Sequence, residues 1–131
     1  MRLLLDTFAF LWYVAADKRL PKATRDLIRA PEHDVWLSAA SVWEIVVKTQ
    51  IERLRLPEPA WTYVVAQRDR HAIAALAIEE GAIRHLAKLP AVHRDPFDRM
   101  LVCQSLQHDL TLVTNDDAIE RYPVKTVWLT T

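Results

Sequence analysis

The sequence predicts an α/β domain with a mostly parallel central sheet. Short apolar runs of strand length, of which residues 110–114 are the clearest, alternate with helical stretches of roughly ten residues. This alternation is typical of parallel strands, because a helix usually provides the crossover that joins one strand to the next. Hydrophobic residues make up 51% of the 131-residue chain, which is enough for one core, so we expect a single domain over residues 1–131.

Apolar spacing and helix-start signals define the elements of the first half of the chain. Phe8 and Trp12 lie one helical turn apart, and Pro21 suits the first turn of a helix. Ser41 and Glu44 match the S-x-x-E capping box, so a helix is expected to open there. The expected elements, in chain order, are a strand at residues 3–5, helices at 8–15 and 21–29, a strand at 35–37, and helices at 41–51 and 61–70.

The second half is expected to continue the alternation. Asp95 followed by Pro96 is a strong helix-start signal, because proline is favoured in the first turn and aspartate caps it. The expected elements are a strand at residues 73–78, a helix at 79–88, a long helix at 96–108, a strand at 110–114, a helical turn at 115–117 and an edge strand at 124–129.

Composition excludes several classes of function. The single glycine, Gly81, cannot form a glycine-rich phosphate loop of the P-loop or dinucleotide-binding type. The single cysteine, Cys103, has apolar neighbours that predict a buried thiol, so cysteine chemistry is not expected. Apolar stretches fall short of the ~20 residues that cross a bilayer, and the N-terminal residues do not resemble a signal peptide. We therefore expect a cytoplasmic protein without membrane contact.

The charges of the chain balance, with 17 basic and 17 acidic residues and a pI near 7.0. Any contact with nucleic acid must therefore be local. Basic pairs occur, although such pairs on helices are more often solvated surface than binding sites. They are Arg53/Arg55, Arg68/Arg70, Arg84/Lys88 and Arg94/Arg99.

Acidic residues follow expected strands or open expected helices at four places. Asp6 follows the first strand, Glu44 lies in the helix after the second, Asp98 is in the first turn of the Pro96 helix, and Asp116 follows the strand at 110–114. In open α/β sheets the ligand site lies beyond the carboxyl ends of the strands. The predicted topology could therefore bring all four carboxylates to one edge of the sheet.

Each acid also has an ordinary structural explanation. An acidic side chain near a helix start accepts backbone N–H bonds and is favoured by the helix dipole by ~0.3–1 kcal/mol. Glu44 could complete the Ser41 capping box, and Asp95 could cap the helix at Pro96 with Asp98 closing that box. Asp116 could belong to an ordinary turn. Taken singly, none of the four predicts a function.

Taken together, the four carboxylates predict a divalent-metal site. Like charges in one pocket repel, and a bound divalent cation relieves that repulsion. Oxygen ligands without cysteine or spaced histidines suit Mg²⁺ or Mn²⁺ better than Zn²⁺. A metal-activated water could then hydrolyse a phosphodiester. The histidines lack zinc-site spacing and are not expected to act; they include His71, His85, His93 and His108.

Five segments of the chain resemble the PIN-domain family, and in particular the VapC-like toxins of bacterial toxin–antitoxin pairs. They are LLLDT at residues 3–7, SAASVWEI at 38–45, LRLP at 54–57, LPAVHRDPFDRML at 89–101 and LVTND at 112–116. The fourth segment is the most specific. One departure is Gly81, where related sequences often have histidine before alanine, so no role is carried over to that position.

The resemblance implies a three-layer α/β/α sandwich that acts as a Mg²⁺- or Mn²⁺-dependent endoribonuclease on RNA. It makes Asp6, Glu44, Asp98 and Asp116 the catalytic, metal-binding acids and Asp95 a further acid of the subgroup. It also implies supporting roles for the neighbouring polar residues Thr7, Ser41, Thr114 and Asn115.

The resemblance further implies a cognate antitoxin protein and a homodimer. Phe8, Trp12 and Trp43 could contact that partner or lie in the core. The alternative hypothesis is a non-catalytic metal-binding or protein-interaction module, for which five tryptophans offer contact surface. A phosphatase with an aspartyl intermediate is disfavoured, because Asp6 lacks a second acid two residues later.

Overall fold

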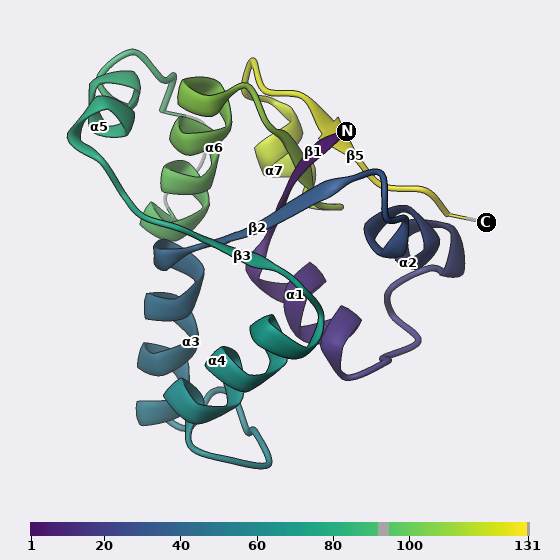
Figure 1. Ribbon diagram of the computed structural model, residues 1–131. Helices are drawn as coiled ribbons and strands as arrows, with labels where there is room; N and C mark the ends of the chain where they lie inside the picture. Colours follow the sequence, from purple (N-terminus) through teal and green to yellow (C-terminus); the bar gives the residue numbers. More distant parts are fainter. Residues whose placement is uncertain (92–94, 131) are drawn as a thin grey trace.

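The protein is described by a computed structural model that covers residues 1–91 and 95–130. Its described strands form one five-stranded sheet in the order β3-β2-β1-β4-β5, and every pairing is parallel. The strands are β1 (Arg2–Leu5), β2 (Asp34–Ser38), β3 (Ala74–Leu76), β4 (Thr111–Val113) and β5 (Thr126–Val127). The predicted mostly parallel sheet is confirmed (Figure 1).

Helices occupy most of the chain between the strands. They are α1 (Thr7–Val14), α2 (Lys22–Arg29), α3 (Ala39–Gln50), α4 (Ala60–Arg70), α5 (Glu80–Leu86), α6 (Pro96–His108) and α7 (Asp117–Glu120). None of the helices in the described ranges is long and apolar enough to cross a membrane.

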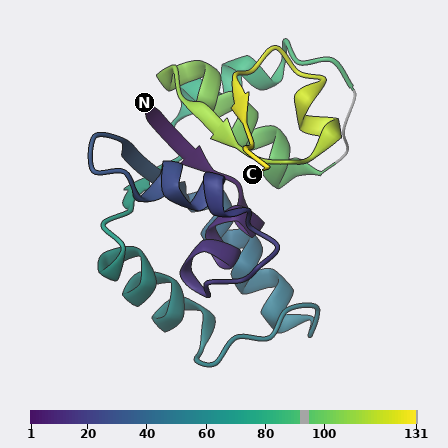
Figure 2. The ribbon, with the colours of Figure 1, turned by 90° about the vertical axis from the view of Figure 1, so that its right-hand side faces the viewer.

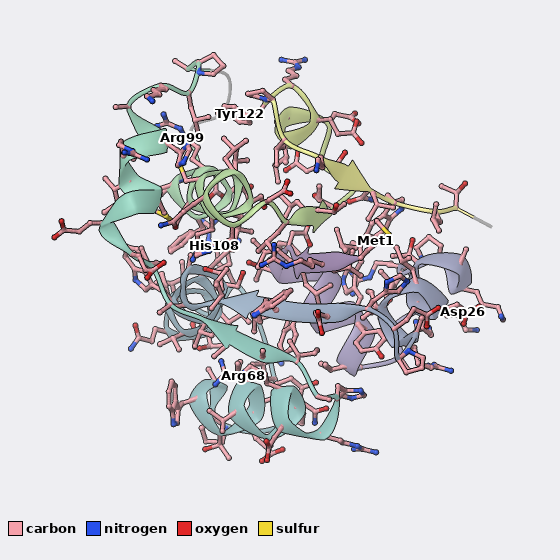
Figure 3. All side chains as sticks on the ribbon, turned by 45° about the horizontal axis from the view of Figure 1, so that its top comes forward. Met1, Asp26, Arg68, Arg99, His108 and Tyr122 are labelled. Carbon is pink, nitrogen blue, oxygen red and sulfur yellow. The ribbon has the colours of Figure 1, made fainter. Side chains whose placement is uncertain are left out.

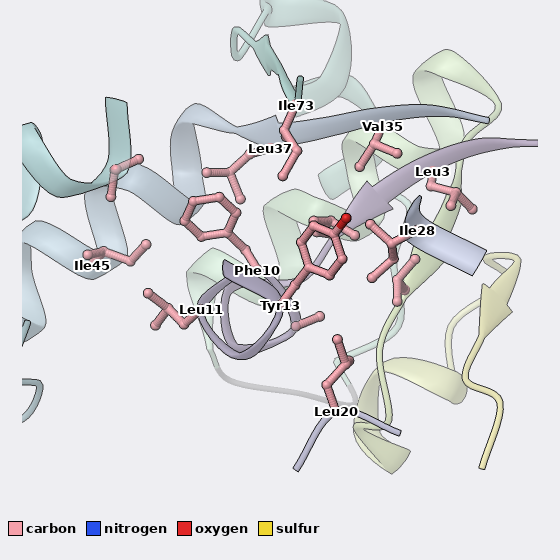
Figure 4. Packing of buried hydrophobic residues seen from close by; sticks show 14 of the residues in the cluster. Leu3, Phe10, Leu11, Tyr13, Leu20, Ile28, Val35, Leu37, Ile45 and Ile73 are labelled. Carbon is pink, nitrogen blue, oxygen red and sulfur yellow. The ribbon is translucent and has the colours of Figure 1, made fainter. Parts of the chain in front are cut away.

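Strand β1 shows why the helices form a layer on each side of the sheet. Its three leucines are fully buried and alternate in direction, as successive side chains of a strand must. Leu3 and Leu5 pack with Phe10 of α1 and Ile28 of α2, as Figure 4 shows for Leu3, Phe10 and Ile28. Leu4 packs instead with the cluster contributed by α6, β4 and α7. Burial on both faces explains the unbroken apolar sequence of this strand.

The two helical layers are visible from the side. Figure 2 shows α6 and α7 on one side of β1, and α1, α2 and α4 on the other. Charged side chains such as Asp26 of α2 project from the outside of these layers (Figure 3). The structure is therefore the three-layer α/β/α sandwich that the sequence predicted.

The order of the strands places a switch point at β1. The chain builds β2 and β3 on one side of β1 and then crosses to β4 and β5 on the other side. Connections diverge at such a point, which leaves a crevice beyond the carboxyl ends of the strands. Asp6 directly follows β1 at this position, and its backbone N–H donates to the Val113 carbonyl of β4 at 3.1 Å.

The start of α3 corrects the sequence prediction. The helix begins directly after β2, and its N-cap is Ser38, whose Oγ accepts a hydrogen bond from the Ala40 N–H at 2.9 Å. Ser41 and Glu44 lie inside the helix and are buried. The S-x-x-E match was therefore not a capping box, because an earlier serine at the end of the strand already caps the helix.

The edge strands β3 and β5 are shorter than the predicted strands at 73–78 and 124–129. Each has a hydrogen-bonded neighbour on one side only, β2 and β4 respectively. The apolar residues of a segment indicate that it is buried, but they do not indicate which residues pair with a neighbouring strand. That pairing determines where an edge strand ends.

Ser38 also connects the two helical layers. Its buried hydroxyl donates to Oε1 of Gln104 in α6 at 2.5 Å, and the Gln104 amide donates to the Ala77 carbonyl at 3.2 Å. Both Ser38 and Gln104 are fully buried. A buried amide needs such partners, because an unpaired one carries the full cost of its lost hydration.

We predict that Ser38→Ala lowers the free energy of unfolding by about 2 kcal/mol, because it removes a helix cap and leaves the Gln104 oxygen without its donor. Urea unfolding followed by circular dichroism measures the change. Ser105→Ala is the matched control, since the buried Ser105 hydroxyl has no hydrogen-bond partner in the described part of the chain. Equal stability of the two variants would contradict the prediction.

Candidate active site

A pocket of about 430 Å³ opens beyond the carboxyl ends of the central strands. All four acids predicted from the sequence contribute to its wall, together with Asp95, Thr7 and Asn115. The remaining lining residues are two cations and two aromatic side chains, namely Arg19, Lys48, Phe8 and Trp12. The fold thus brings the predicted acids together; their catalytic and metal-binding roles stay predictions at this stage.

Asp6 is the most buried of the four aspartates in this pocket, with 9% of its surface exposed. It caps α1, since its Oδ1 accepts a hydrogen bond from the Ala9 N–H at 2.6 Å. Burial raises the pKa of Asp6 from 3.8 to about 6, against the lowering effect of hydrogen bonds from Thr114 and Ala9. The charges of Asp116 and Glu44 raise it further. A cation bound beside Asp6 would therefore favour its ionised form.

Glu44 enters the pocket from the middle of α3, with 2% of its surface exposed. The Thr7 hydroxyl donates to its Oε1 at 2.6 Å and lies 3.0 Å from the Ser41 Oγ. Lys48, one turn later on the same helix, places its Nζ 2.5 Å from Oε2. Both carboxylate oxygens are thus engaged, and Ser41 reaches Glu44 only through Thr7; the supporting roles of Thr7 and Ser41 stay predictions.

Asp95 and Asp98 lie at the start of α6. Asp95 is its N-cap: Oδ1 accepts hydrogen bonds from the Phe97 and Asp98 N–H groups, at 2.8 and 3.1 Å. Both aspartates line the pocket, so the capping role of Asp95 also positions Asp98. Part of the most specific segment of the resemblance precedes them but lies outside the described residues, namely Val92, His93 and Arg94.

Asp116 follows β4 and caps the short helix α7, with its Oδ1 accepting from the Ala118 N–H at 2.9 Å. The Thr114 hydroxyl accepts from the Asp116 N–H at 3.1 Å. Since a hydrogen bond from Thr114 also lowers the pKa of Asp6, this buried threonine connects two of the acids. Asn115, which stands between Thr114 and Asp116 in the sequence, also lines the pocket.

The donor set fits Mg²⁺ or Mn²⁺. Carboxylates dominate the wall, and such hard cations prefer oxygen ligands. Within residues 1–91 and 95–130, no three acidic, histidine or cysteine side chains converge closely enough to form a ready-made site. Magnesium usually keeps several waters and uses one or two protein carboxylates, so close convergence of three is not required. We therefore expect the cation to be held partly through water.

The cations of the pocket were missed in the sequence. Neither Lys48 nor Arg19 belongs to the basic pairs singled out there, and the described members of those pairs do not line the pocket. Lys48 could have been found from its spacing, since it lies four residues after Glu44 on one helix. Arg19 lies in the connection between α1 and α2. Because this connection has no regular helical or strand period, the sequence does not predict where the Arg19 side chain points.

The aromatic residues proposed as partner contacts are partly exposed. Phe8 is 42% exposed and lies at the pocket with the half-buried Trp12, their ring centroids 6.0 Å apart. Trp43 is 58% exposed and packs edge-on against Phe97, with 4.8 Å between the ring centroids. Neither Phe8 nor Trp43 is therefore a core residue.

Comparison with known proteins agrees with the fold and the sequence pattern. The model of the PIN domain family matches residues 3–125. Ribonuclease VapC16 of Mycobacterium tuberculosis is 31% identical over 62 residues, which cover 47% of this chain. The matched part spans 44% of the length of that relative.

Three solved structures share the fold at low sequence identity. A chain in the VapBC2 structure from Rickettsia felis, bound to a promoter DNA fragment, has a TM-score of 0.73 and 14% identity, covering 97% of this chain and 98% of its own. Chains of DNA-bound VapBC from Salmonella typhimurium and of VapBC-1 from Haemophilus influenzae have TM-scores of 0.69 and 0.66. Both are 18% identical, with 97% of each chain covered.

The pKa of Asp6 predicts how the metal-free protein responds to pH. Because that pKa is raised in the folded state, the folded protein binds more protons than the unfolded chain between pH 3.8 and about 6. Stability should therefore fall as pH rises through this window. Asp6→Asn, a comparable helix cap, should remove this fall and raise the free energy of unfolding by about 2–3 kcal/mol near neutral pH.

Urea unfolding in EDTA at a series of pH values measures this difference. Asp69→Asn, an exposed change on α4 outside the pocket, is the control. The prediction fails if the wild-type and Asp6→Asn stabilities stay parallel across the pH range.

Proposed function

Because the chain belongs to the PIN domain family, we propose that it is a Mg²⁺- or Mn²⁺-dependent endoribonuclease that hydrolyses RNA phosphodiester bonds. The observation that carries the proposal is the meeting of Asp6, Glu44, Asp98 and Asp116 in one pocket at the switch point of the sheet. A metal-binding module without catalysis would not need an open pocket large enough for a phosphodiester beside these acids. Similarity to a protein named ribonuclease supports the same conclusion.

The four acids would hold the divalent cation, some of them through bound water, while Asp95 caps α6 and so fixes the backbone of Asp98. When bound, the cation would neutralise negative charge on the phosphate and lower the pKa of a bound water molecule. Thr7 fixes the direction of the Glu44 carboxylate, and Thr114 does the same for Asp6. These hydroxyls keep the acids in position before metal arrives, which reduces the reorganisation needed on binding.

RNA binding must overcome the negative charge of the pocket. Five carboxylates and two cations line it, so an RNA backbone is repelled until a divalent cation is present. Phe8 and Trp12 also line the pocket, and aromatic side chains beside a nucleic-acid site can stack with unpaired bases. With a balanced overall charge, the protein should select RNA by shape more than by general affinity. We expect an enzyme that acts on RNA in this way to work in the cytoplasm.

We further propose that the enzyme is the toxin of a toxin–antitoxin pair. The three solved structures described above are VapBC complexes by name. A second hollow of about 360 Å³, whose wall includes Leu54, Leu56 and Tyr63, adjoins the acidic pocket and shares Phe8, Trp12 and Arg19 with it. A partner segment bound there would cover the entrance to the acids. The homodimer implied by the resemblance stays a prediction.

Asp98→Asn should abolish cleavage of a panel of structured RNAs and weaken Mn²⁺ binding, while the metal-free protein stays as stable as the wild type or becomes more stable. Asp95→Asn should retain most activity and stability, because asparagine caps a helix comparably, whereas Asp95→Ala should lose ~0.5–2 kcal/mol. Gel assays with and without EDTA, with thermal melts in Mn²⁺, measure these effects.

Undiminished cleavage in EDTA, or full activity in Asp98→Asn, would contradict the proposal. Loss of activity in both asparagine variants would make Asp95 a metal ligand as well. A wild-type protein that binds Mn²⁺ but cleaves no RNA would favour the non-catalytic alternative.

Expression of the wild-type protein should slow the growth of a bacterial host, and coexpression of a small protein encoded beside it should restore growth. Asp98→Asn, which should lose cleavage, is the harmless control. Growth curves and copurification of the two proteins test both parts. Normal growth together with no copurifying partner would overturn the toxin assignment and leave the nuclease assignment intact.

A further inference from the structure

Lys48 is a cation placed inside an acidic pocket. Its Nζ lies 2.5 Å from Glu44 Oε2 and 5.0 Å from the centroid of the Phe8 ring. The Lys48 side chain is 29% exposed and the Glu44 side chain 3%. The ammonium group is therefore held between a buried carboxylate and an aromatic face, at the wall of the pocket.

An ordinary helical ion pair does not account for this position. Lys22 and Asp26 on α2 have the same spacing and lie 2.8 Å apart, but their side chains are 83% and 51% exposed. Exposed pairs of this kind contribute only weakly to helix stability, because water screens their charges. Burying the Lys48–Glu44 pair adds a desolvation penalty that can exceed the attraction between the charges. Helix stability is thus a weak reason for placing the pair here.

The two cations of the pocket differ in what holds them. Arg19 makes a two-point contact with Asp17, at 3.1 and 2.8 Å, and Asp17 does not line the acidic pocket. The partner of Lys48 is Glu44, one of the proposed metal-binding acids. If Glu44 turns to a bound divalent cation, Lys48 loses its partner while Arg19 keeps its own. Lys48 then presents an unpaired ammonium in the pocket at the moment when substrate must bind.

We propose that Lys48 is a phosphate-binding residue for RNA, and that it exchanges Glu44 for a phosphate oxygen when Glu44 takes part in binding a divalent cation. The flexible four-carbon stem of lysine allows such a movement of its charge. In the metal-free protein the Lys48 ammonium neutralises the charge of Glu44 and so reduces the repulsion among the acids of the pocket. This inference rests on the function proposed above, because it names a residue that would hold its substrate.

Lys48→Met tests the proposal, since methionine preserves much of the apolar stem and removes the charge. Binding of a short fluorescein-labelled RNA with a single-stranded loop, taken from the panel because the wild-type protein cleaves it, is measured in Ca²⁺ by fluorescence anisotropy at several salt concentrations. A gel verifies that the RNA stays intact. We expect roughly tenfold weaker binding and a salt slope shallower by about 0.7, which is the loss of one phosphate contact. Lys48→Arg should retain most of the affinity.

Mn²⁺ binding, followed by isothermal titration calorimetry without RNA, separates the RNA contact from damage to the metal site. Lys48→Met should bind Mn²⁺ as tightly as the wild type or more tightly, because a competing cation has been removed. Lys22→Met, which breaks the exposed pair of the same spacing, should change neither measurement. If Lys48→Met melts well below the wild type, Lys48→Gln replaces it, since glutamine can still hydrogen-bond to Glu44.

Unchanged RNA affinity and salt slope in Lys48→Met or Lys48→Gln would overturn this proposal while leaving the proposed nuclease function in place. Absence of metal-dependent RNA binding in the wild-type protein would contradict both. Weaker RNA binding accompanied by equally weaker Mn²⁺ binding would also overturn it, because Lys48 would then act only by holding the metal-binding acids.

Discussion

Burial of like charges at the switch point of the sheet is the constraint on which the rest of this structure depends. Asp6 and Glu44 are almost inaccessible to water, and the charge of Glu44 adds to the burial that raises the pKa of Asp6. An apolar core alone would not tolerate this arrangement. Hydroxyl groups, helix N-termini and the Lys48 ammonium offset the cost of burying these carboxylates. The interactions that shape the pocket are therefore also interactions that stabilise the fold.

The helix starts show how the compensation is achieved. Asp6, Asp95 and Asp116 each cap a helix, so backbone N–H groups donate hydrogen bonds to these carboxylates and stabilise their negative charge. The same hydrogen bonds fix the direction of each carboxylate group. One interaction therefore stabilises a helix and orients a carboxylate that could bind the proposed cation. This explains why the structural and the functional interpretation of these aspartates, which looked like alternatives in the sequence, are compatible.

Glu44 is held differently, and the difference was not visible in the sequence. It lies in the middle of α3, where no free N–H group is available, and depends on the side chains of Thr7 and Lys48. Thr7 comes from another helix, 37 residues earlier in the chain. Local spacing suggested a capping box with Ser41, but Ser38 begins the helix because β2 ends there and its hydroxyl also serves Gln104.

The sequence by itself determined the alternation of strands and helices, the parallel sheet and the identity of the four acids, because apolar periodicity and the position of an acid after a strand are local properties. Tertiary structure alone decided that these acids share one pocket with Lys48, Arg19 and an aromatic rim. It also decided that β3 and β5 stay short, since pairing at a sheet edge depends on a neighbour distant in the chain. The relative orientation and separation of side chains on different helices and strands are set only when those elements pack together. The chemistry proposed for this pocket depends on both quantities.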